Sequence, residues 1–491
     1  MHDARSYDEL PYADYAFPRS HPEHLQAVSL LCGRAAPSFA RARVLELGCA
    51  RGGNLLPMAV DLPDGDFVGV DLSARHIAEA EARVLRFGMR NVTLVHGSLD
   101  ALDEALGDFD YIVCHGVYSW VPPAVRAAIL RVCRARLRPD GVAYVSFNAL
   151  PGWNALRTLR DFLRMHVPEG AAPARVGAAR RALAVYDEAL RAGGGAYAAW
   201  MRAELAALAE ADDSYVFHEL LEAHNEPVYL KDFVDAARAQ GMAYLADADL
   251  SVAAPALRGG ATDPVALAQS VDFAVNRRFH AALLVRDTGV AWRVDVASIA
   301  RMHLATRAEL AADCEETTLR GERPFVFTVD GVAREVRDVW LGALLATLAV
   351  EERRPVPYAI ACARVAAMLR LDATSARTLA AKRAADVLEL LWEGVVTPHL
   401  GGARYEAEAS LRPWSSPYAR AQAVMGTAVT TFRHAQVDVA AFERSVLALL
   451  DGTRDRSALV AELGATAGRC EEALAWLARN ALLAERDGKT T

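Results

Sequence analysis

Cysteine is scarce in this sequence and forms no recognisable framework. The 491 residues include seven cysteines, and no two of them make a Cys-x-x-Cys pair. Their spacing favours neither a zinc site nor a set of disulfides. An odd number of unpaired thiols is typical of a reducing compartment. We therefore expect a cytoplasmic protein without a metal ion.

Long hydrophobic runs and an excess of basic charge are also missing. No stretch approaches the ~18 uninterrupted apolar residues of a membrane helix. The opening MHDARSYDELPY lacks the apolar core of a secretory signal. Only three of the 54 basic residues are lysine, and the formal net charge is −8, whereas nucleic-acid binders usually carry a basic surface. We therefore expect no membrane span and no nucleic-acid partner.

What the sequence does contain is an alternation of strand and helix patterns. Between residues 41 and 150, five runs rich in valine, isoleucine and leucine alternate with amphipathic helices. This order predicts a buried, mostly parallel sheet with right-handed crossovers, which is an α/β Rossmann-like fold. The pattern then becomes helical over 151–226, and strand patterns return between 227 and 300.

The length of the chain predicts roughly three to four folding units. We expect an N-terminal cap at 1–40, a Rossmann-like core at 41–150, a helical lid insertion at 151–226, a regulatory or middle segment at 227–300 that completes the core sheet, and mainly helical, winged-helix-like units at 301–405 and 406–491. The last two units are inferred because two stretches share one plan, in which helices precede a short apolar run.

A glycine-rich turn directly follows the first strand, in the segment VLELGCARGGN at 44–54. A strand, a glycine-rich turn and a helix together point backbone N–H groups into a nucleotide-binding crevice. A pyrophosphate site uses Gly-x-Gly-x-x-Gly, whereas here an acid and three small residues recur at every second position, as Glu46, Gly48, Ala50 and Gly52. The acid would repel a phosphate but suits an ammonium and a sulfonium. The turn therefore favours S-adenosyl-L-methionine, and Arg51, at an x position, does not discriminate.

Two further anchors follow at the ends of the next strands. Asp71 ends the second strand, 19 residues after Gly52, at the spacing where an acid accepts hydrogen bonds from ribose hydroxyls. The segment HGSL at 96–99 follows the third strand and is placed to bind adenine, although many methyltransferases carry an acid at the position of Ser98. The predicted cofactor contacts are Glu46, Gly48, Cys49, Ala50, Gly52, Asn54, Asp71, Leu72, Gly97, Ser98, Leu99, His115, Tyr7 and Tyr12.

The segment HGVYSW at 115–120 ends the fourth strand, where a methyl acceptor would arrive. Tyr118 and Trp120 are predicted to wall the acceptor site and to stabilise positive charge by cation–π contact, or else to pack in the core. His115 is predicted to accept a proton, to bind the carboxylate end of the cofactor, or to support a turn. Asn148, at the end of the fifth strand, is predicted to accept a hydrogen bond from an amine or to cap a helix or turn. These four residues are the predicted catalytic set.

Two other groups of polar residues have weaker assignments. The leader is rich in aromatic residues, and its Tyr7, Tyr12 and Tyr15 are placed to fold over the cofactor or to form a packing arm. Near the end of the helical insertion, His218, Glu219 and Asn225 are expected to be structural.

Several segments together resemble class I methyltransferases that carry a methyltransferase regulatory domain. The similar segments are SYDELPY (6–12), VLELGCARGGNLLPMA (44–59), FVGVDLSARHIAEA (67–80), FDYIVCHGVYSWVPPAVR (109–126), VAYVSFNALPGW (142–153), FHELLEAHNEPVYLKDFV (217–234) and LLDGTRDRSALV (449–460). The resemblance implies a Rossmann core, a middle domain and a C-terminal domain. It also implies similarity to bacterial protein-lysine methyltransferases that modify a surface protein. The chain departs from this family at Arg51, where relatives usually have a small residue, and at Phe147.

The leading expectation is therefore a methyltransferase that uses S-adenosyl-L-methionine and modifies a protein or peptide side chain, with lysine Nε as the first candidate. One alternative is a small-molecule or natural-product N- or O-methyltransferase. Another is a catalytically silent protein that senses the cofactor. The large helical modules favour a bulky acceptor, for which a surface protein is one candidate, and a homodimer is a further expectation.

Overall fold

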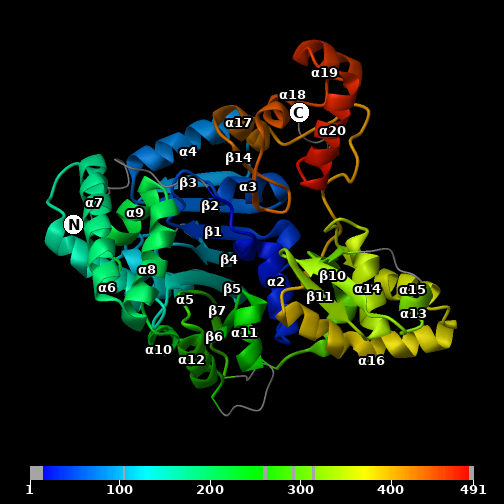
Figure 1. Ribbon diagram of the computed structural model, residues 1–491, viewed down its shortest axis with the longest axis horizontal. Coiled ribbons are helices and arrows are strands. Elements are labelled where there is room, and N and C mark those ends of the chain that lie inside the picture. The colour runs from blue at the N-terminus through cyan, green and yellow to red at the C-terminus, as the bar shows by residue number, and fades with distance from the viewer. Residues whose placement is uncertain (1–14, 103–105, 258–262, 290–292, 312–315, 486–491) are drawn as a thin grey trace.

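The computed structural model describes residues 15–102, 106–257, 263–289, 293–311 and 316–485. At its centre is a seven-stranded sheet with the order β3-β2-β1-β4-β5-β7-β6 (Figure 1). Its strands are β1 (Arg43–Leu47), β2 (Asp66–Asp71), β3 (Val92–His96), β4 (Phe109–Cys114), β5 (Leu137–Asn148), β6 (Met242–Asp247) and β7 (Phe279–Arg286). Strands β1 to β5 are parallel, and β7 runs antiparallel to both β5 and β6. The expected Rossmann-like α/β fold is confirmed.

Strand order reverses between β1 and β4, so that chain segments leaving these strands diverge. A crevice opens at the carboxyl ends of the strands at such a point, and ligands of α/β proteins bind there. The glycine-rich turn after β1 and the HGVYSW segment after β4 are therefore the two sides of one crevice.

Both faces of the sheet are buried, which explains the nearly continuous apolar runs of its strands. Along β1, Val44 packs into one hydrophobic core, whereas Leu45 and Leu47 pack into the other. The first core includes α2 (Pro22–Leu31), α3 (Leu55–Asp61) and α11 (Leu250–Leu257), and the second includes α5 (Pro123–Arg136), α10 (Leu230–Ala239) and α12 (Pro264–Val275). Helix α4 (Ala74–Phe87) follows β2.

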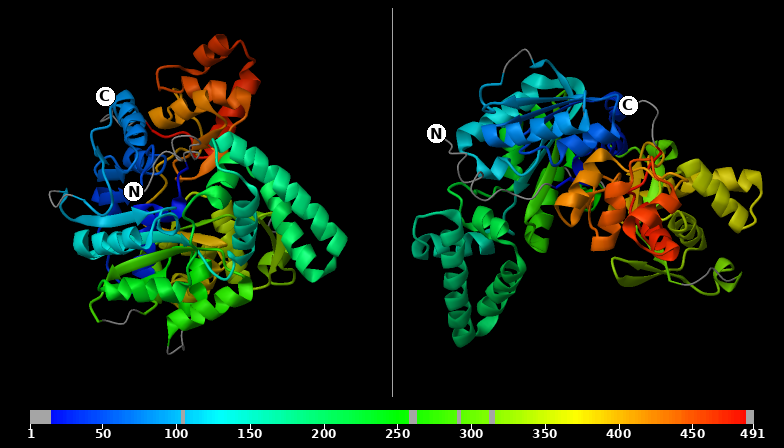
Figure 2. Two further views of the ribbon diagram at one scale, coloured as in Figure 1. Left: turned by 90° about the vertical axis from the view of Figure 1, so that its left-hand side faces the viewer. Right: turned by 90° about the horizontal axis from the view of Figure 1, so that it is seen from above.

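A block of four helices is inserted between β5 and β6. Its members are α6 (Asn154–His166), α7 (Ala172–Gly193), α8 (Gly195–Glu210) and α9 (Asp213–Leu221), and they share a hydrophobic core of their own. Gly194 has φ = 63°, in the left-handed region that favours glycine, and it separates α7 from α8. The block projects from the sheet on the side away from the C-terminal units (Figures 1 and 2).

The C-terminal part of the chain forms two packed units. The first contains the sheet β12-β8-β13, the sheet β11-β10-β9 and three long helices: β8 (His303–Thr306), β9 (Glu309–Leu310), β10 (Phe325–Val329), β11 (Val332–Val336), α14 (Val339–Ala349), β12 (Val356–Pro357), α15 (Tyr358–Met368), α16 (Ala373–Trp392) and β13 (Val396–His399). Its core is continuous with the first core of the central sheet.

The second unit combines four helices with one β-hairpin around a separate core. Its elements are α17 (Pro417–Met425), β14 (Ala428–Thr430), β15 (Gln436–Asp438), α18 (Ala441–Leu449), α19 (Arg456–Leu463) and α20 (Ala467–Arg479). This is a winged-helix arrangement, and we call the hairpin β14–β15 with its connecting turn 431–435 the wing. Among the described helices, none has both the length and the apolar character needed to cross a membrane.

Candidate functional site

The turn after β1 is held against β2 by backbone hydrogen bonds. The N–H groups of Gly48 and Cys49 both donate to the Val70 carbonyl, at 2.8 and 3.1 Å. Gly48 has φ = 76°, and a Cβ there would lie 2.5 Å from Cγ2 of Val117. Gly52 has φ = 78°, while Ala50 is held at φ = 45°. The glycines are therefore needed for this backbone path, and the path leads the chain into α3.

Asp71 lies at the tip of β2, beside this turn. Its Oδ2 accepts the N–H of Ala50 at 2.8 Å, and its Oδ1 accepts the N–H of Ser73 at 2.9 Å. The carboxylate is thus fixed by two main-chain donors, and its side chain is 15% exposed. The remaining lone pairs of the two oxygens can accept hydrogen bonds from a pair of ribose hydroxyls.

The loop after β3 lies next to Asp71, because the Gly97 N–H donates to the Asp71 carbonyl at 3.0 Å. Leu99 is buried in the core, whereas Leu72 at the end of β2 is 36% exposed. Leu72 is therefore the better placed of the two to contact an adenine ring. The Ser98 hydroxyl donates to the carboxylate of Asp100, an exposed acid that the sequence analysis missed. Asp100 can supply the acid that Ser98 lacks, and its position in the same loop was the available signal.

Glu46 lies in the floor of the crevice and is only 4% exposed. Its Oε1 accepts a hydrogen bond from Nδ2 of Asn54 at 2.8 Å, while its Oε2 is buried without a hydrogen-bond partner among the described residues. Burial, with a smaller contribution from the charge of Asp71, raises the pKa of Glu46 to about 8. An unsatisfied buried carboxyl oxygen is a suitable contact for the ammonium group of S-adenosylmethionine.

The side chains of Cys49 and Arg51 take no direct part in this floor. Cys49 is buried, and its Sγ packs against Gly69 of β2, where an added Cβ would lie only 2.8 Å from the sulfur. Cys49 can therefore contribute to the crevice through its backbone. Nη1 of Arg51 lies 3.9 Å from Oε2 of Glu79 on α4. The cation in the middle of the glycine-rich turn thus has an acidic neighbour within the protein.

His115, at the end of β4, is enclosed by aromatic rings. Its ring stacks on Phe17 with a centroid distance of 3.5 Å, and its Nδ1 lies 2.8 Å from the Tyr144 hydroxyl. Burial lowers the pKa of His115 to about 3, so that the ring is neutral at physiological pH. Phe17 was not among the residues predicted from the sequence, although it lies in the aromatic leader only two residues after Tyr15.

Tyr118 and Trp120 point into the protein and are not brought together with His115. Tyr118 is 4% exposed, contacts the Phe233 ring edge-on at 5.1 Å and has the guanidinium of Arg126 at 5.6 Å from its centroid. Trp120 is 8% exposed. These contacts favour the core-packing alternative, and we leave both residues out of the proposed acceptor site.

Asn148 is joined by a buried polar network to the last residues of the helical insertion. Its N–H donates to the Ser119 hydroxyl at 2.8 Å, and its Nδ2 donates to Oδ1 of Asn225 at 3.1 Å. Nδ2 of Asn225 donates to the Glu219 carbonyl at 3.0 Å. Burial raises the pKa of the Glu219 carboxyl to about 8. The Asn148 amide is thus already engaged, which favours its structural alternative.

A cleft of about 1020 Å³ begins at His115 and Phe17. Phe279 at the start of β7 and Asp249 after β6 line its wall on the side of the sheet. The opposite wall is formed by the two C-terminal units and the segment that joins them, through residues such as Arg307, Thr397, Arg404 and His434. The cleft therefore needs both halves of the chain, and its inner end is the carboxyl edge of the sheet.

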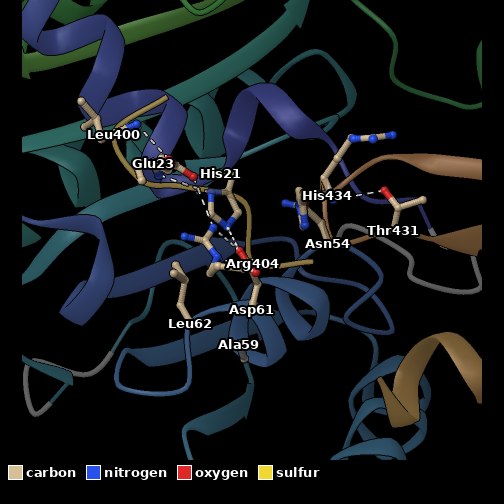
Figure 3. Close-up of polar contacts among 12 residues, drawn as sticks. His21, Glu23, Asn54, Ala59, Asp61, Leu62, Leu400, Arg404, Thr431 and His434 are labelled. Atoms are coloured by element: carbon tan, nitrogen blue, oxygen red, sulfur yellow. Dashed lines mark hydrogen bonds and ion pairs between the residues drawn. The ribbon is translucent and has the colours of Figure 1, made fainter. Parts of the chain in front are cut away.

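Asn54 lies beside His434 of the wing (Figure 3), which lines the cleft, and Asn54 makes several polar contacts around it. Its Oδ1 accepts the Phe17 N–H and lies within hydrogen-bond distance of Nε2 of His434 on the wing. Its Nδ2 donates to the Ser20 hydroxyl and to Oε1 of Glu46. Ser20 and His434 were missed by the sequence analysis, and no local pattern marks His434. Tyr15 is 42% exposed, and the predicted contacts Tyr7 and Tyr12 lie outside the described residues.

Three families of known domains match this chain. Residues 44–141 match "Methyltransferase domain", residues 212–286 match "Predicted methyltransferase regulatory domain", and residues 412–482 match "PKMT, C-terminal winged helix domain". The chain is 30% identical over 476 residues to the uncharacterized protein RP789 of Rickettsia prowazekii, covering 93% of this chain and 85% of that protein. A second protein of that organism, RP028, is 36% identical over 234 residues, or 48% of this chain and 94% of the relative.

A solved structure shares nearly the whole architecture. The structure of PKMT2 from Rickettsia typhi matches with a TM-score of 0.86 over 96% of this chain and 100% of that chain, at 24% identity. A structure of the same protein in complex with AdoHcy matches with a TM-score of 0.84. At this level of identity the likeness establishes a common fold.

Proposed function

Since the chain belongs to the S-adenosylmethionine-dependent methyltransferases that combine a methyltransferase domain, a regulatory domain and a PKMT winged helix, we propose that its acceptor is a protein side chain, and specifically the Nε amine of a lysine.

The cofactor is proposed to lie across the carboxyl ends of β1, β2 and β4. Asp71 would hold the ribose hydroxyls, because its carboxylate is fixed by the N–H groups of Ala50 and Ser73. Glu46 would face the amino-acid end, because one of its oxygens is buried and lacks a partner in the described structure. Leu72 and the 97–99 loop would border the adenine.

The cleft that begins at His115 is the observation that carries the proposed acceptor class. The cleft, of about 1020 Å³, has an opposite wall built from separate C-terminal units, and a polypeptide segment can contact the central sheet and both of these units at once. A lysine side chain is long enough to extend from such a segment towards the end of β4. The PKMT relationship of residues 412–482 supports the same class.

The chemistry asks for a neutral amine held in line with the transferred methyl group. When bound, S-adenosylmethionine supplies that methyl group as an electrophile. A lysine amine has an ordinary pKa of about 10.4, and burial among Phe17, His115 and Phe279 would lower it and favour the neutral form. The neutral His115 adds no positive charge there. The proton lost by the amine leaves through the open cleft to water.

Incubation of the full chain with isotopically labelled S-adenosylmethionine and a cell lysate tests the acceptor. The label is expected in the protein fraction, on Nε-methyllysine after hydrolysis, and at a cofactor concentration below its Kd the labelling should fall about tenfold or more with Asp71→Ala. Label confined to small molecules would instead support an N- or O-methyltransferase of metabolites. Cofactor binding without any labelled product would support the silent sensor. A surface protein as the acceptor, a homodimer and a cytoplasmic location stay predictions.

A further inference from the structure

Helix α3 follows the glycine-rich turn, and residues from the C-terminal part of the chain hold both of its ends (Figure 3). At its last residue, Asp61, the guanidinium of Arg404 makes a two-point contact, with Nε at 2.8 Å from Oδ1 and Nη2 at 2.5 Å from Oδ2. Nη2 of Arg404 also lies 3.2 Å from Oε2 of Glu23 on α2. We call Asp61, Glu23 and Arg404 the latch.

At the other end of α3, the residue before the helix is Asn54, which meets the wing. Nε2 of His434 lies 2.8 Å from Oδ1 of Asn54, across a sequence separation of 380 residues. Both side chains are nearly inaccessible, with 4% of His434 and 5% of Asn54 exposed. His434 stands at the tip of the wing with φ = 54°, and its backbone N–H donates to the Thr431 carbonyl within the tight turn.

The donors around Asn54 fix the orientation of its amide. The Phe17 N–H can only donate, and it lies 2.9 Å from Oδ1, so the amide oxygen must face Phe17 and His434. The amide nitrogen then faces Glu46 and the Ser20 hydroxyl, at 2.8 and 3.1 Å. Because the oxygen can only accept, His434 must donate from a protonated Nε2. Burial keeps the pKa of His434 well below its ordinary value, which agrees with a neutral ring that carries this one proton.

One amide therefore connects three parts of the site. Its oxygen accepts hydrogen bonds from His434 of the wing and from the backbone N–H of Phe17. The ring of Phe17 stacks on His115 at the inner end of the cleft. Its nitrogen donates a hydrogen bond to the carboxyl of Glu46 beneath the glycine-rich turn. The contacts of Asn54 thus link His434 both to Glu46, at the proposed amino-acid end of the cofactor, and to Phe17 and His115 on the acceptor side.

We propose that His434 is a positioning residue of the cofactor site: the wing of the C-terminal winged helix, once docked, orients Asn54 and through it Glu46, so that the cofactor binds tightly only to the docked form. This role rests on the proposed place of the cofactor. It assigns to the winged helix a function in cofactor binding, in addition to any contact with a protein substrate.

Calorimetric titration of S-adenosylhomocysteine into the full chain tests the proposal. His434→Leu removes the donor while keeping a side chain of similar size, and it should weaken the affinity about tenfold, since a tenfold change corresponds to about 1.4 kcal/mol and one buried hydrogen bond contributes about that much. His434→Gln retains an N–H donor at comparable reach and should restore most of the affinity.

Two control variants separate positioning from simple destabilisation. Leu459→Val lies in the core of the same unit and should lower its melting temperature without changing the affinity. Asp438→Asn lies on the exposed side of the wing and should change neither. All titrations are made well below the melting temperature of each variant.

The outcomes distinguish this inference from the proposed function. If the unaltered chain binds S-adenosylhomocysteine and His434→Leu binds equally well, the positioning role is wrong and the cofactor site stands. Equal weakening by His434→Leu, His434→Gln and Leu459→Val would also overturn it, because affinity would then follow stability alone. If the unaltered chain does not bind the ligand, the proposed function itself fails.

Discussion

Glu46 has a buried carboxyl group, and binding of the cofactor should change its protonation. It sits between an amide donor, Asn54, and a second acid, Asp71, and its pKa is raised to about 8 mainly by burial. Near pH 7, and without a charged ligand beside it, Glu46 is therefore mostly protonated. An ammonium group placed beside it favours the carboxylate, because an opposite charge at short range stabilises the ionised form.

Binding of S-adenosylhomocysteine at pH 7 should consequently release about one proton per site. Calorimetry in two buffers of different ionisation enthalpy measures this number. Glu46→Gln keeps the amide contact with Asn54 but should abolish the release. A release of the same size in this variant would show that Glu46 does not face the ammonium.

Some single residues of the site could be predicted from the sequence, and others could not. Gly48, Gly52 and Asp71 follow from spacing, because a strand, a turn and the next strand tip impose local geometry. Leu72 and Leu99 are both apolar and both lie in loops that follow strands, and only tertiary packing decides that Leu72 is exposed while Leu99 is buried. Tyr118 was open to two readings for the same reason, and its contacts with Phe233 and Arg126 favour packing.

At the scale of elements, strands β6 and β7 are fastened to the sheet by a buried charge cluster. His280 on β7 has Nδ1 at 2.9 Å from Asp247 at the end of β6 and Nε2 at 2.9 Å from Asp272 on α12. Arg277 and Gln269 also contact Asp272. Despite burial, the two carboxylates raise the pKa of His280 to about 9. The protonated imidazole therefore links one strand to the next and to a helix.

This cluster predicts a pH dependence of stability. The folded pKa lies above the ordinary value of about 6.5, so the contribution of His280 is complete below pH 6.5 and is lost as the pH rises towards about 9. The loss should be on the order of 2–4 kcal/mol. Urea unfolding at several pH values between 6 and 9 gives the free energy of unfolding of the unaltered chain and of His280→Gln. The loss is the extra decrease of this free energy with pH in the unaltered chain. Parallel slopes would contradict the assignment.

The order of the elements was accessible from sequence because it depends on local patterns. Runs of valine, isoleucine and leucine marked β1 to β5, and the return of strand patterns after the helical stretch marked β6 and β7, which do pair with β5 through β7. The pairing of β7 between β5 and β6 is a long-range choice that no local pattern specifies. The polar network of Asn148, Asn225 and Glu219 joins two such distant segments and was missed as a unit.

At the scale of the whole molecule, the latch joins segments that are far apart in sequence. Asp61 and Arg404 are 343 residues apart, and their side chains are 8% and 33% exposed. The guanidinium holds the pKa of Asp61 well below its usual range against the opposing effect of burial. Such contacts depend on how the units pack, so neither the latch nor the contact of His434 could be read from spacing along the chain.

Arg404→Ala should destabilise the protein strongly, because it leaves the buried carboxylates of Asp61 and Glu23 without their cation. The expected loss is about 3–5 kcal/mol, as is usual when one partner of a buried pair is removed. Chemical unfolding followed by tryptophan fluorescence measures it. As a control, Lys231→Ala breaks the exposed pair with Asp235 and should have little effect. Equal effects of the two variants would mean that the latch contributes no more than a surface pair.

We propose that the carboxyl edge of β1 and β2 binds the methyl donor, and the affinity of S-adenosylhomocysteine for three proteins tests this placement. The unaltered chain is predicted to bind one equivalent. Asp71→Ala should bind at least about tenfold more weakly, since hydrogen bonds to a charged group contribute about 1.5–3 kcal/mol. Asp66→Ala, at the opposite end of β2, should match the unaltered chain. No binding by the unaltered chain, or equal binding by Asp71→Ala, would contradict the account.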